Sequence, residues 1–329
     1  MKKFWWAGVL VFLGCISLEA QQLPLLNQRH LNPFLYNPAL AGSDNHAIIN
    51  LTRRQQFASN DTPALTYFSF NTPVSGDGGF GFNFFNASQD TSSQSLALVS
   101  FGRAVPLAED ELFYFGIAGG FGLDKYELTR IDNPGIPGLQ SAVESNSYFN
   151  GQIGVHYRKK ELSVGLVLPS LVKSDTISGK DFNQHRFSPF RNLYLNASYS
   201  LTVVEEQLVF EPNIIYRINK DIPSQLEALA LFHYRDQIWV GGGYRQKYGG
   251  LLLAGIHLQD IISLGYSFEF KSDQEFGPVS SNHEVHLGVR IGATRIPPKK
   301  GFDRVKEKEP EGSMKPRFYY EPKKKNKGN

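Results

Sequence analysis

The most constraining feature of this chain is a side-chain alternation with a period of two, which recurs in about fourteen short segments. Residues 262–271, ISLGYSFEFK, are typical: large apolar side chains alternate with small or polar ones. Successive side chains of a β-strand point to opposite faces, so each segment has one apolar wall and one polar wall. The sequence therefore predicts an all-β fold.

A water-soluble sandwich would show the same alternation, so further features decide between the two architectures. The segments run to about eight to eleven residues, aromatics and glycine are abundant, and a secretory signal precedes them. No run approaches the roughly 18 apolar residues that a membrane helix requires. Together these features predict a transmembrane antiparallel β-barrel whose apolar face is turned to lipid.

The connections between the segments test this prediction independently. In bacterial barrels, short periplasmic turns alternate with longer external loops. With a first strand that runs outward, the long connections 127–147 and 170–191 both fall outside, and the tight connections near 158–160, 204–207, 235–236 and 260–261 all fall inside. The segment 226–234 has the weakest pattern, because Leu229 and Leu231 compete with Ala228 and Ala230 for the outer face. The predicted strands are 47–54, 64–71, 79–86, 94–105, 112–126, 148–157, 161–169, 192–203, 208–218, 226–234, 237–246, 251–259, 262–271 and 283–292.

The N-terminus has the pattern of a cleavable signal peptide. Lys2 and Lys3 precede an apolar stretch over residues 4–18, and we expect cleavage after Ala20. The only cysteine, Cys15, lies in this segment, where Leu-Gly-Cys also resembles a lipoprotein box and would make it a lipid anchor. After cleavage at Ala20 the chain has no cysteine, which excludes disulfides, thiol catalysis and cysteine-ligated metals.

The mature chain divides into three predicted parts. Residues 21–46 are irregular and rich in Asn, Pro and Leu, and we expect them to fold into the lumen as a plug or to cover its periplasmic mouth. Residues 47–296 form the barrel. Residues 297–329 form a flexible periplasmic tail, which contains eleven Lys/Arg and five Asp/Glu. A mildly acidic body with a basic tail is not typical of nucleic-acid binding, so no nucleic-acid partner is predicted.

Motifs for chemistry are lacking in the sequence. It contains no Walker A motif, dinucleotide fingerprint or G-x-S-x-G elbow. The sequence His-Glu-Val-His at 283–286 resembles a truncated zinc-protease motif, but its histidines are three apart in a predicted strand and therefore face opposite walls. We predict no enzyme, cofactor or metal site.

Inward-facing charges are the better candidates for a role. They form either a lumen network that stabilises the barrel, or a selectivity path or plug contact. The predicted lumen network is Glu211, Arg217, Arg245, Glu269, Glu284 and Arg290.

The external loop 170–191 mixes cations with aromatics, a composition typical of protein–protein hot spots. It is either a partner-binding surface or an ordinary solvated loop. The predicted partner-binding residues are Lys173, Lys180, His185, Arg186, Phe187 and Phe190.

The start of the mature chain resembles a known family. Its elements are Gln-Gln-Leu-Pro at 21–24, Leu-Asn-Pro at 31–33, Tyr-Asn-Pro-Ala-Leu-Ala-Gly-Ser at 36–43 and Arg-Arg-Gln-Gln-Phe at 53–57. With His-Glu-Val and an alternating last strand near the C-terminus, they resemble the PorP/SprF family of type IX secretion system membrane proteins. Phe57 stands where that family usually has tryptophan. The residues that carry this resemblance, and that we expect to be structural, are Asn32, Asn37, Pro38, Gly42, Arg53, Gln56 and Phe57.

The resemblance implies an outer-membrane barrel of Bacteroidota that works in protein secretion or gliding motility. It implies three kinds of partner: the C-terminal domain of a secreted cell-surface adhesin-like protein, periplasmic secretion-system or envelope proteins, and outer-membrane lipid. We expect both the N-terminus and the tail in the periplasm. The leading hypothesis is a non-enzymatic adhesin anchor. The alternatives are a channel for small or hydrophobic solutes, and a barrel enzyme acting on lipid or protein.

Overall fold

The structure is a computed structural model of the whole chain. It describes residues 26–44, 46–57, 64–75, 77–89, 92–108, 110–127, 143–175, 184–187, 192–205, 207–219, 224–246, 248–259, 261–271 and 281–292. Among these residues, no helix is long and apolar enough to cross a membrane.

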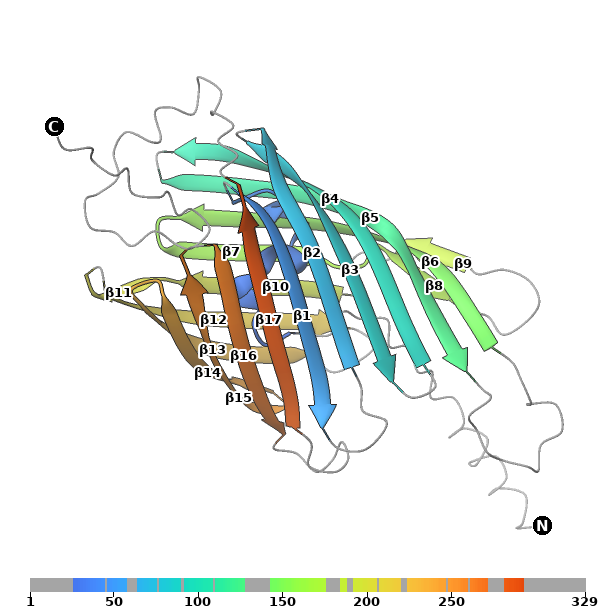
Figure 1. Cartoon of the computed structure of the whole chain (residues 1–329). Helices are drawn as coiled ribbons and strands as arrows, with labels where there is room; N and C mark the ends of the chain where they lie inside the picture. The colour runs from blue at the N-terminus through green and yellow to red at the C-terminus, as the bar shows by residue number, and fades with distance from the viewer. Residues whose placement is uncertain are drawn as a thin grey trace, which may run out of the picture.

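The described chain is built almost wholly of strands, preceded by three short 3₁₀ helices (Figure 1). The helices are η1 (Arg29–Leu31), η2 (Pro33–Leu35) and η3 (Pro38–Leu40). The strands are β1 (Ala47–Phe57), β2 (Ala64–Ser75), β3 (Gly78–Gln89), β4 (Ser92–Ala108), β5 (Glu111–Glu127), β6 (Val143–Lys159), β7 (Leu162–Leu168), β8 (Val172–Asp175), β9 (Gln184–Phe187), β10 (Asn192–Tyr199), β11 (Leu201–Val204), β12 (Leu208–Asn219), β13 (Gln225–Tyr234), β14 (Ile238–Arg245), β15 (Gly249–Leu258), β16 (Ile262–Lys271) and β17 (Ser281–Ile291).

The sheet closes on itself. Neighbouring strands pair antiparallel in chain order, β1 pairs with β17, and β10 pairs with both β7 and β12. Because β10 and β11 are separated only by Ser200, they occupy one position, and the result is a closed 14-strand barrel. The predicted all-β antiparallel barrel is confirmed, and each predicted strand corresponds to one position in it.

The two ends of the barrel differ, as the connection lengths predicted. The tight turns after β2, β4, β6, β11, β13 and β15 gather at one end, here called the short-turn end. The connections after β5 and β7 lie at the opposite, long-loop end. The second of these contains a separate two-stranded hairpin, β8–β9.

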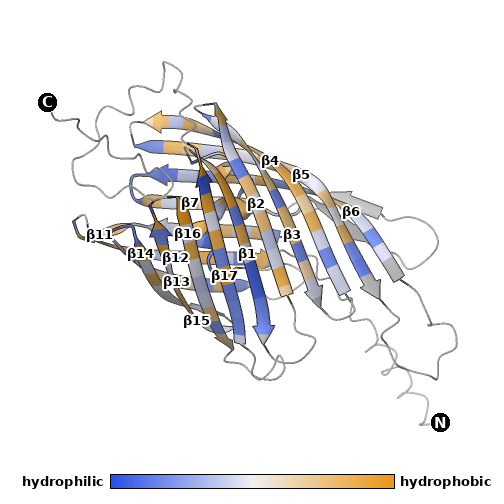
Figure 2. Ribbon diagram, in the orientation of Figure 1, coloured by the Kyte–Doolittle hydropathy of each residue, from blue (hydrophilic) through white to orange (hydrophobic). Residues whose placement is uncertain are grey.

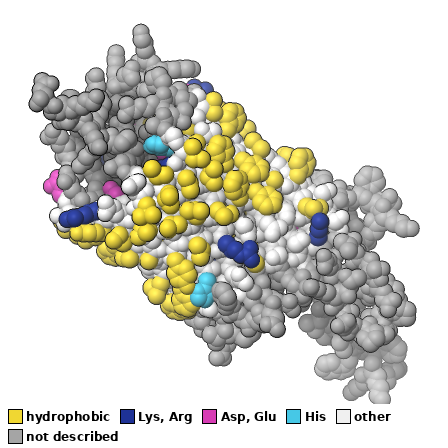
Figure 3. Space-filling view, in the orientation of Figure 1, with side chains coloured by type: hydrophobic (Ala, Val, Ile, Leu, Met, Phe, Trp, Pro, Cys, Tyr) yellow, Lys and Arg dark blue, Asp and Glu magenta, His cyan; other side chains and the backbone are white. Residues whose placement is uncertain are grey.

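The outer wall is apolar. Phe121 is 72% exposed, and large apolar side chains point outward from most strands. Figure 2 shows orange apolar bands along the strands, and Figure 3 shows a broad yellow surface over the strands facing the viewer. An exposed apolar band around a closed barrel is the surface that a bilayer covers. Alternation therefore sends large apolar side chains out to lipid, and the inner wall carries polar side chains together with buried apolar ones.

The strand β13 resolves the ambiguity at 226–234. Leu226 and Phe232 are exposed on its outer face, whereas Leu229 and Leu231 are buried on its inner face. The inward leucines pack with Trp239, Leu251 and Leu253, and Leu31 packs against this cluster. The inner wall is apolar here because an apolar side chain from the N-terminal segment lies against it.

Residues 26–44, here called the lumen segment, lie inside the barrel (Figure 1). The segment begins beside Glu284, nearer the long-loop end of β17, and ends with Asp44 next to Arg290 at the short-turn end. Most of its residues are buried, and none is exposed.

Candidate functional site: the lumen

The Asn-Pro-Ala-Leu-Ala-Gly sequence of the lumen segment builds its own turn. Asn37 is the N-cap of η3, since its Oδ1 accepts the backbone N–H of Ala39 at 3.0 Å, and Pro38 occupies the first helical position. Both are preferred choices at a helix start. Asn37 Nδ2 also donates to the carbonyl of Val155 on β6 at 3.0 Å. One side chain therefore caps the turn and ties it to the wall.

Glycines of the inner wall make room for this turn. A Cβ on Gly116 would collide with the backbone of Pro38 and Ala39, and one on Gly102 would lie 2.8 Å from the Ala39 carbonyl oxygen. A Cβ on Gly154 would likewise collide with Asn37 Oδ1. The inner faces of β4, β5 and β6 are therefore a surface against which the lumen segment packs closely.

The segment turns toward β1 at Gly42, where the backbone requires glycine. Gly42 has a φ of +66°, which side-chain-bearing residues rarely adopt. A Cβ there would lie 2.5 Å from the Cα of Gly79 and 2.7 Å from the Thr72 carbonyl oxygen. Conformation and space both exclude a side chain at this position.

A buried chain of ion pairs joins the segment to the wall. Arg29 Nη1 lies 2.5 Å from Glu227 Oε1, and Arg245 Nε donates to Glu227 Oε2 at 2.7 Å. Arg245 Nη1 donates to Glu269 Oε2 at 3.0 Å, and the same oxygen accepts from Arg54 Nη2 at 2.8 Å. Cations and anions alternate along this chain, so each buried charge has an opposite neighbour, which offsets much of the cost of desolvation.

Glu284 binds the backbone of the lumen segment. Its Oε2 accepts the N–H of Asn27 at 2.9 Å, and its Oε1 accepts the N–H of Gln28 at 2.8 Å. Gln28 Nε2 donates to the Glu284 carbonyl at 3.1 Å, and Arg245 Nη2 donates to Asn27 Oδ1 at 2.9 Å. The start of the segment is thus held by a carboxylate, a carbonyl and a guanidinium of the barrel.

Aromatic and apolar contacts complete the packing. Tyr36 stacks on Tyr194 of β10 with ring centroids 5.6 Å apart, and its hydroxyl accepts the N–H of Leu26 at 2.6 Å. Burial raises the pKa of Tyr36 above its usual value. His30 lies edge-on to Trp239 of β14, with ring centroids 4.5 Å apart.

The six predicted network residues are not one cluster. Arg245 and Glu284 both bind Asn27, and Glu269 pairs with Arg245. Glu211 instead lies 3.3 Å from His233, and Arg290 lies 3.6 Å from Asp44 near the short-turn end. Arg217 is on the inner side of β12, where the register places it opposite Tyr194.

Sequence reasoning missed three members of the ion-pair chain. Glu227 lies on the strand with the weakest alternation, and Arg29 lies in a segment without periodicity. Arg54 had a usable signal, since it occupies an inner-wall position of β1.

The remaining predicted residues are spread over the molecule. Asn32 Nδ2 donates to Ser69 Oγ at 2.8 Å, whereas Arg53 faces outward and donates to Thr66 Oγ1 at 3.1 Å. Gln56 and Phe57 end β1, and the side chain of Phe57 lies outside the described residues. Of the predicted loop residues, the backbone of Lys173, His185, Arg186 and Phe187 forms the β8–β9 hairpin, and Lys180 and Phe190 lie outside the described residues.

The histidines at 283 and 286 face opposite walls of β17. His286 is buried in the lumen, with Nδ1 2.8 Å from Thr52 Oγ1, and His283 is outside, with Nδ1 2.6 Å from the Tyr266 hydroxyl oxygen. No group of metal-ligating side chains occurs among the described residues.

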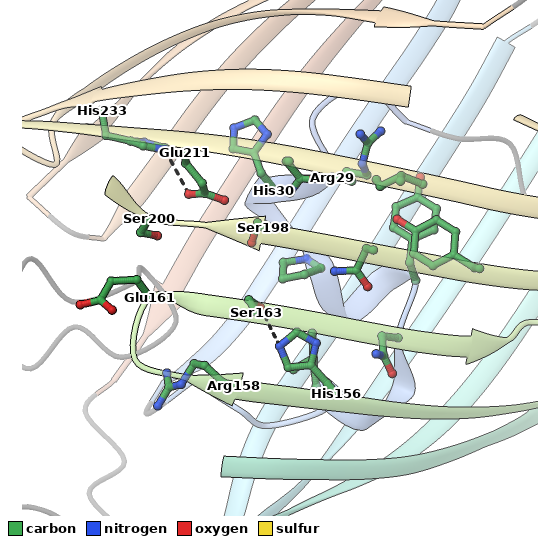
Figure 4. Close-up of a pocket in the computed structure, with 18 of the residues that line it drawn as sticks. Arg29, His30, His156, Arg158, Glu161, Ser163, Ser198, Ser200, Glu211 and His233 are labelled. Carbon is green, nitrogen blue, oxygen red and sulfur yellow. Dashed lines mark hydrogen bonds and ion pairs between the residues drawn. The ribbon is translucent and has the colours of Figure 1, made fainter. Parts of the chain in front are cut away.

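A polar recess lies between the lumen segment and the wall, toward the short-turn end (Figure 4). It has a volume of about 870 Å³, including space open to solvent. His233 and Glu211 pair on one side, and His156 Nε2 lies 2.8 Å from Ser163 Oγ on the other. Arg29 and His30 of the lumen segment contribute to its lining.

The chain matches one protein family and is similar to several solved β-barrel structures. No curated protein matches the chain. Among solved structures, it is similar to the Pseudomonas putida toluene transporter TodX (12% identity, TM-score 0.46, covering 79% of this chain and 94% of that one). It is also similar to a Pseudomonas aeruginosa FadL homologue (11% identity, TM-score 0.46, covering 82% of this chain and 94% of that one). A third similar structure is Acinetobacter baumannii Omp33 (5% identity, TM-score 0.42, covering 75% of this chain and 100% of that one).

The family model that matches is described as type IX secretion system membrane protein PorP/SprF, and it covers residues 18–289. This range takes in the lumen segment and nearly every strand, including the Asn-Pro-Ala-Leu-Ala-Gly turn and Glu284 of the last strand. A closed barrel with an apolar outer belt is the architecture of outer-membrane proteins. The chain is an outer-membrane β-barrel that belongs to the PorP/SprF family of type IX secretion system membrane proteins.

Proposed function

We propose that this protein is a non-enzymatic socket of the type IX secretion or gliding system. In this role it anchors, or helps to secrete, a cell-surface adhesin-like protein by docking that protein's C-terminal domain at the long-loop end. The observation that carries the proposal is the fastening of the lumen segment: buried ion pairs, backbone hydrogen bonds to Glu284 and close packing on wall glycines. A barrel filled in this way favours a rigid platform over an open pore.

The proposal includes an orientation. Short turns of bacterial barrels face the periplasm and longer loops face outward. The short-turn end, where β17 ends and the basic tail continues, is then periplasmic, and the tail engages an anionic envelope or secretion-system partner. The signal peptide and its cleavage after Ala20 belong to the same proposal.

Cysteine labelling tests the orientation. The only cysteine lies in the expected signal peptide, so single cysteines can be placed on an otherwise cysteine-free chain. A cysteine within 128–142 should react with a membrane-impermeant maleimide in intact cells. One at Asp236, in the β13–β14 turn, should react only after the outer membrane is opened. The reverse pattern would contradict the orientation.

The docking surface is tested by loop replacement. Replacing residues 172–187 with a Gly-Ser linker should release the adhesin-like protein from the cell surface and leave the barrel folded. The matched control replaces 273–279, at the same end of the barrel, and should retain it. Equal retention in both variants would count against docking on this loop.

A second function, a channel for small or hydrophobic solutes, is favoured by one observation. The polar recess of about 870 Å³ lies beside the lumen segment and is open to solvent. A channel predicts ion conductance or solute uptake when the purified protein is reconstituted in liposomes. A sealed barrel under these conditions would eliminate it.

A further inference from the structure

A polar cluster interrupts the apolar outer wall at its long-loop edge. On β1 the outward side chains change from Leu51, which is 44% exposed, to Arg53 and then Gln55. On β17 they change from Val285 to His283. The register pairs Arg53 with Val285 and Gln55 with His283, so the change occurs at adjacent positions of these two strands. On β16, the other neighbour of β17, Phe270 lies beyond this point and is 46% exposed, so the polar cluster is local to β1 and β17.

Arg53 differs in its partners from Arg103 and Lys159, two other outward cations. Its Nη1 donates to Thr66 Oγ1 on β2 at 3.1 Å, and no carboxylate pairs with it within the described part of the chain. Near the short-turn end, by contrast, Arg103 lies 2.6 Å from Asp77, and Lys159 pairs with Glu111. Carboxylates of the protein pair with these two cations, whereas the described residues offer none to Arg53.

The bilayer is the available source of an anion for Arg53. A cation on the outer wall of a barrel is costly unless it reaches the headgroup level. A guanidinium has a planar array of N–H donors that matches phosphate oxygens, and Thr66 occupies only one of its nitrogens. Nearby, His283 bonds the Tyr266 hydroxyl, with 2.6 Å between Nδ1 and the oxygen, and so provides a polar flank.

We propose that Arg53, positioned by Thr66 and flanked by His283, binds the phosphate of an outer-leaflet glycolipid headgroup. The inference rests on the proposed orientation, in which the long-loop end faces outward, because that places Arg53 in the glycolipid leaflet. The site fixes the depth and rotation of the barrel in the membrane through a specific lipid contact, in addition to its apolar belt.

The test is lipid binding to the full-length mature protein in detergent, measured by native mass spectrometry. The probes are phosphorylated lipid A, the same lipid after phosphatase treatment, an anionic phospholipid and inorganic phosphate. Arg53→Gln should weaken the binding of phosphorylated lipid A about tenfold, as expected for loss of a charge-assisted contact. Arg103→Gln, on the same outer wall but ion-paired in the wild type, should leave it unchanged.

Other variants and outcomes keep the inference falsifiable. Thr66→Val removes only the positioning hydrogen bond and should weaken binding several-fold, and Arg53→Lys should recover part of it. Equal binding by the wild type and Arg53→Gln would overturn the proposal. So would equal binding of the phosphatase-treated lipid, the phospholipid or free phosphate. If Arg53→Gln does not fold, Thr66→Val decides. Failure here leaves adhesin docking untouched, whereas the cysteine labelling reports separately on the orientation.

Discussion

The carboxylate of Glu284, on the last strand, accepts the backbone N–H of Asn27, near the start of the lumen segment, at 2.9 Å. The two residues are 257 positions apart in the sequence, so this bond forms only when the barrel has closed around the segment. The lumen segment and the last strand, which closes the sheet, therefore stabilise each other.

Replacing Glu284 should therefore loosen the segment. Glu284→Ala leaves two buried N–H groups without an acceptor and should lower the free energy of unfolding by about 3 kcal/mol. The measurement is denaturant unfolding in lipid vesicles. Glu111→Ala is the control, since Lys159 and Glu111 pair on the exposed surface, and its effect should be small. Equal effects would contradict the role given to Glu284.

Glu227 should be at least as important, because it neutralises two buried cations. Glu227→Ala leaves Arg29 without its carboxylate and Arg245 with only Glu269, and we expect a loss of about 3–5 kcal/mol. The double variant Arg29→Leu/Glu227→Leu removes both charges of this pair. It should recover part of the stability that is lost when Glu227 alone is replaced. This account would be contradicted if the double variant lost more free energy of unfolding than the two single variants lose together.

The wall glycines predict an asymmetry between the two faces of β5. Gly116→Ala puts a methyl group into the Pro38 backbone and should displace the lumen segment, which limited proteolysis near residue 40 would reveal. Gly119→Ala is the matched control, because its Cβ would lie 3.6 Å from Phe149, an ordinary contact. Protection from proteolysis in both variants would argue against close packing of the segment.

Removal of the segment should change the permeability of the barrel. Deleting residues 26–40 takes out Arg29 and the η1–η3 helices and leaves a polar lumen lined by Glu227, Arg245 and Glu269. We expect the variant to conduct ions in planar bilayers and the wild type not to conduct. Equal conductance in both would favour the channel hypothesis.

Much of the fold could be predicted from the alternation, because in a barrel the strand period alone decides which side chains face lipid. The strands and the placement of the long connections followed from it. The interior could not be predicted in the same way. Leu229 and Leu231 face inward because Leu31 lies against their cluster, and Glu227 pairs with Arg29. Such contacts join segments far apart in the sequence, and no local period reports them.

The candidate site shows the same division. Arg245, Glu269 and Glu284 could be predicted as inward charges from their strand positions. The contacts of Glu284 and Arg245 with the lumen segment could not, since that segment has no periodicity: Glu284 accepts the backbone N–H groups of residues 27 and 28, and Arg245 donates to the side chain of Asn27.

The most direct test of the central claim is affinity purification of the tagged protein from detergent-solubilised outer membranes, with mass spectrometry of what co-purifies. We predict recovery of a large secreted surface protein, bound through its C-terminal domain and lost when residues 172–187 are replaced. Recovery of the barrel alone, under conditions in which a known envelope complex survives, would contradict the anchoring role and leave the channel as the function to test.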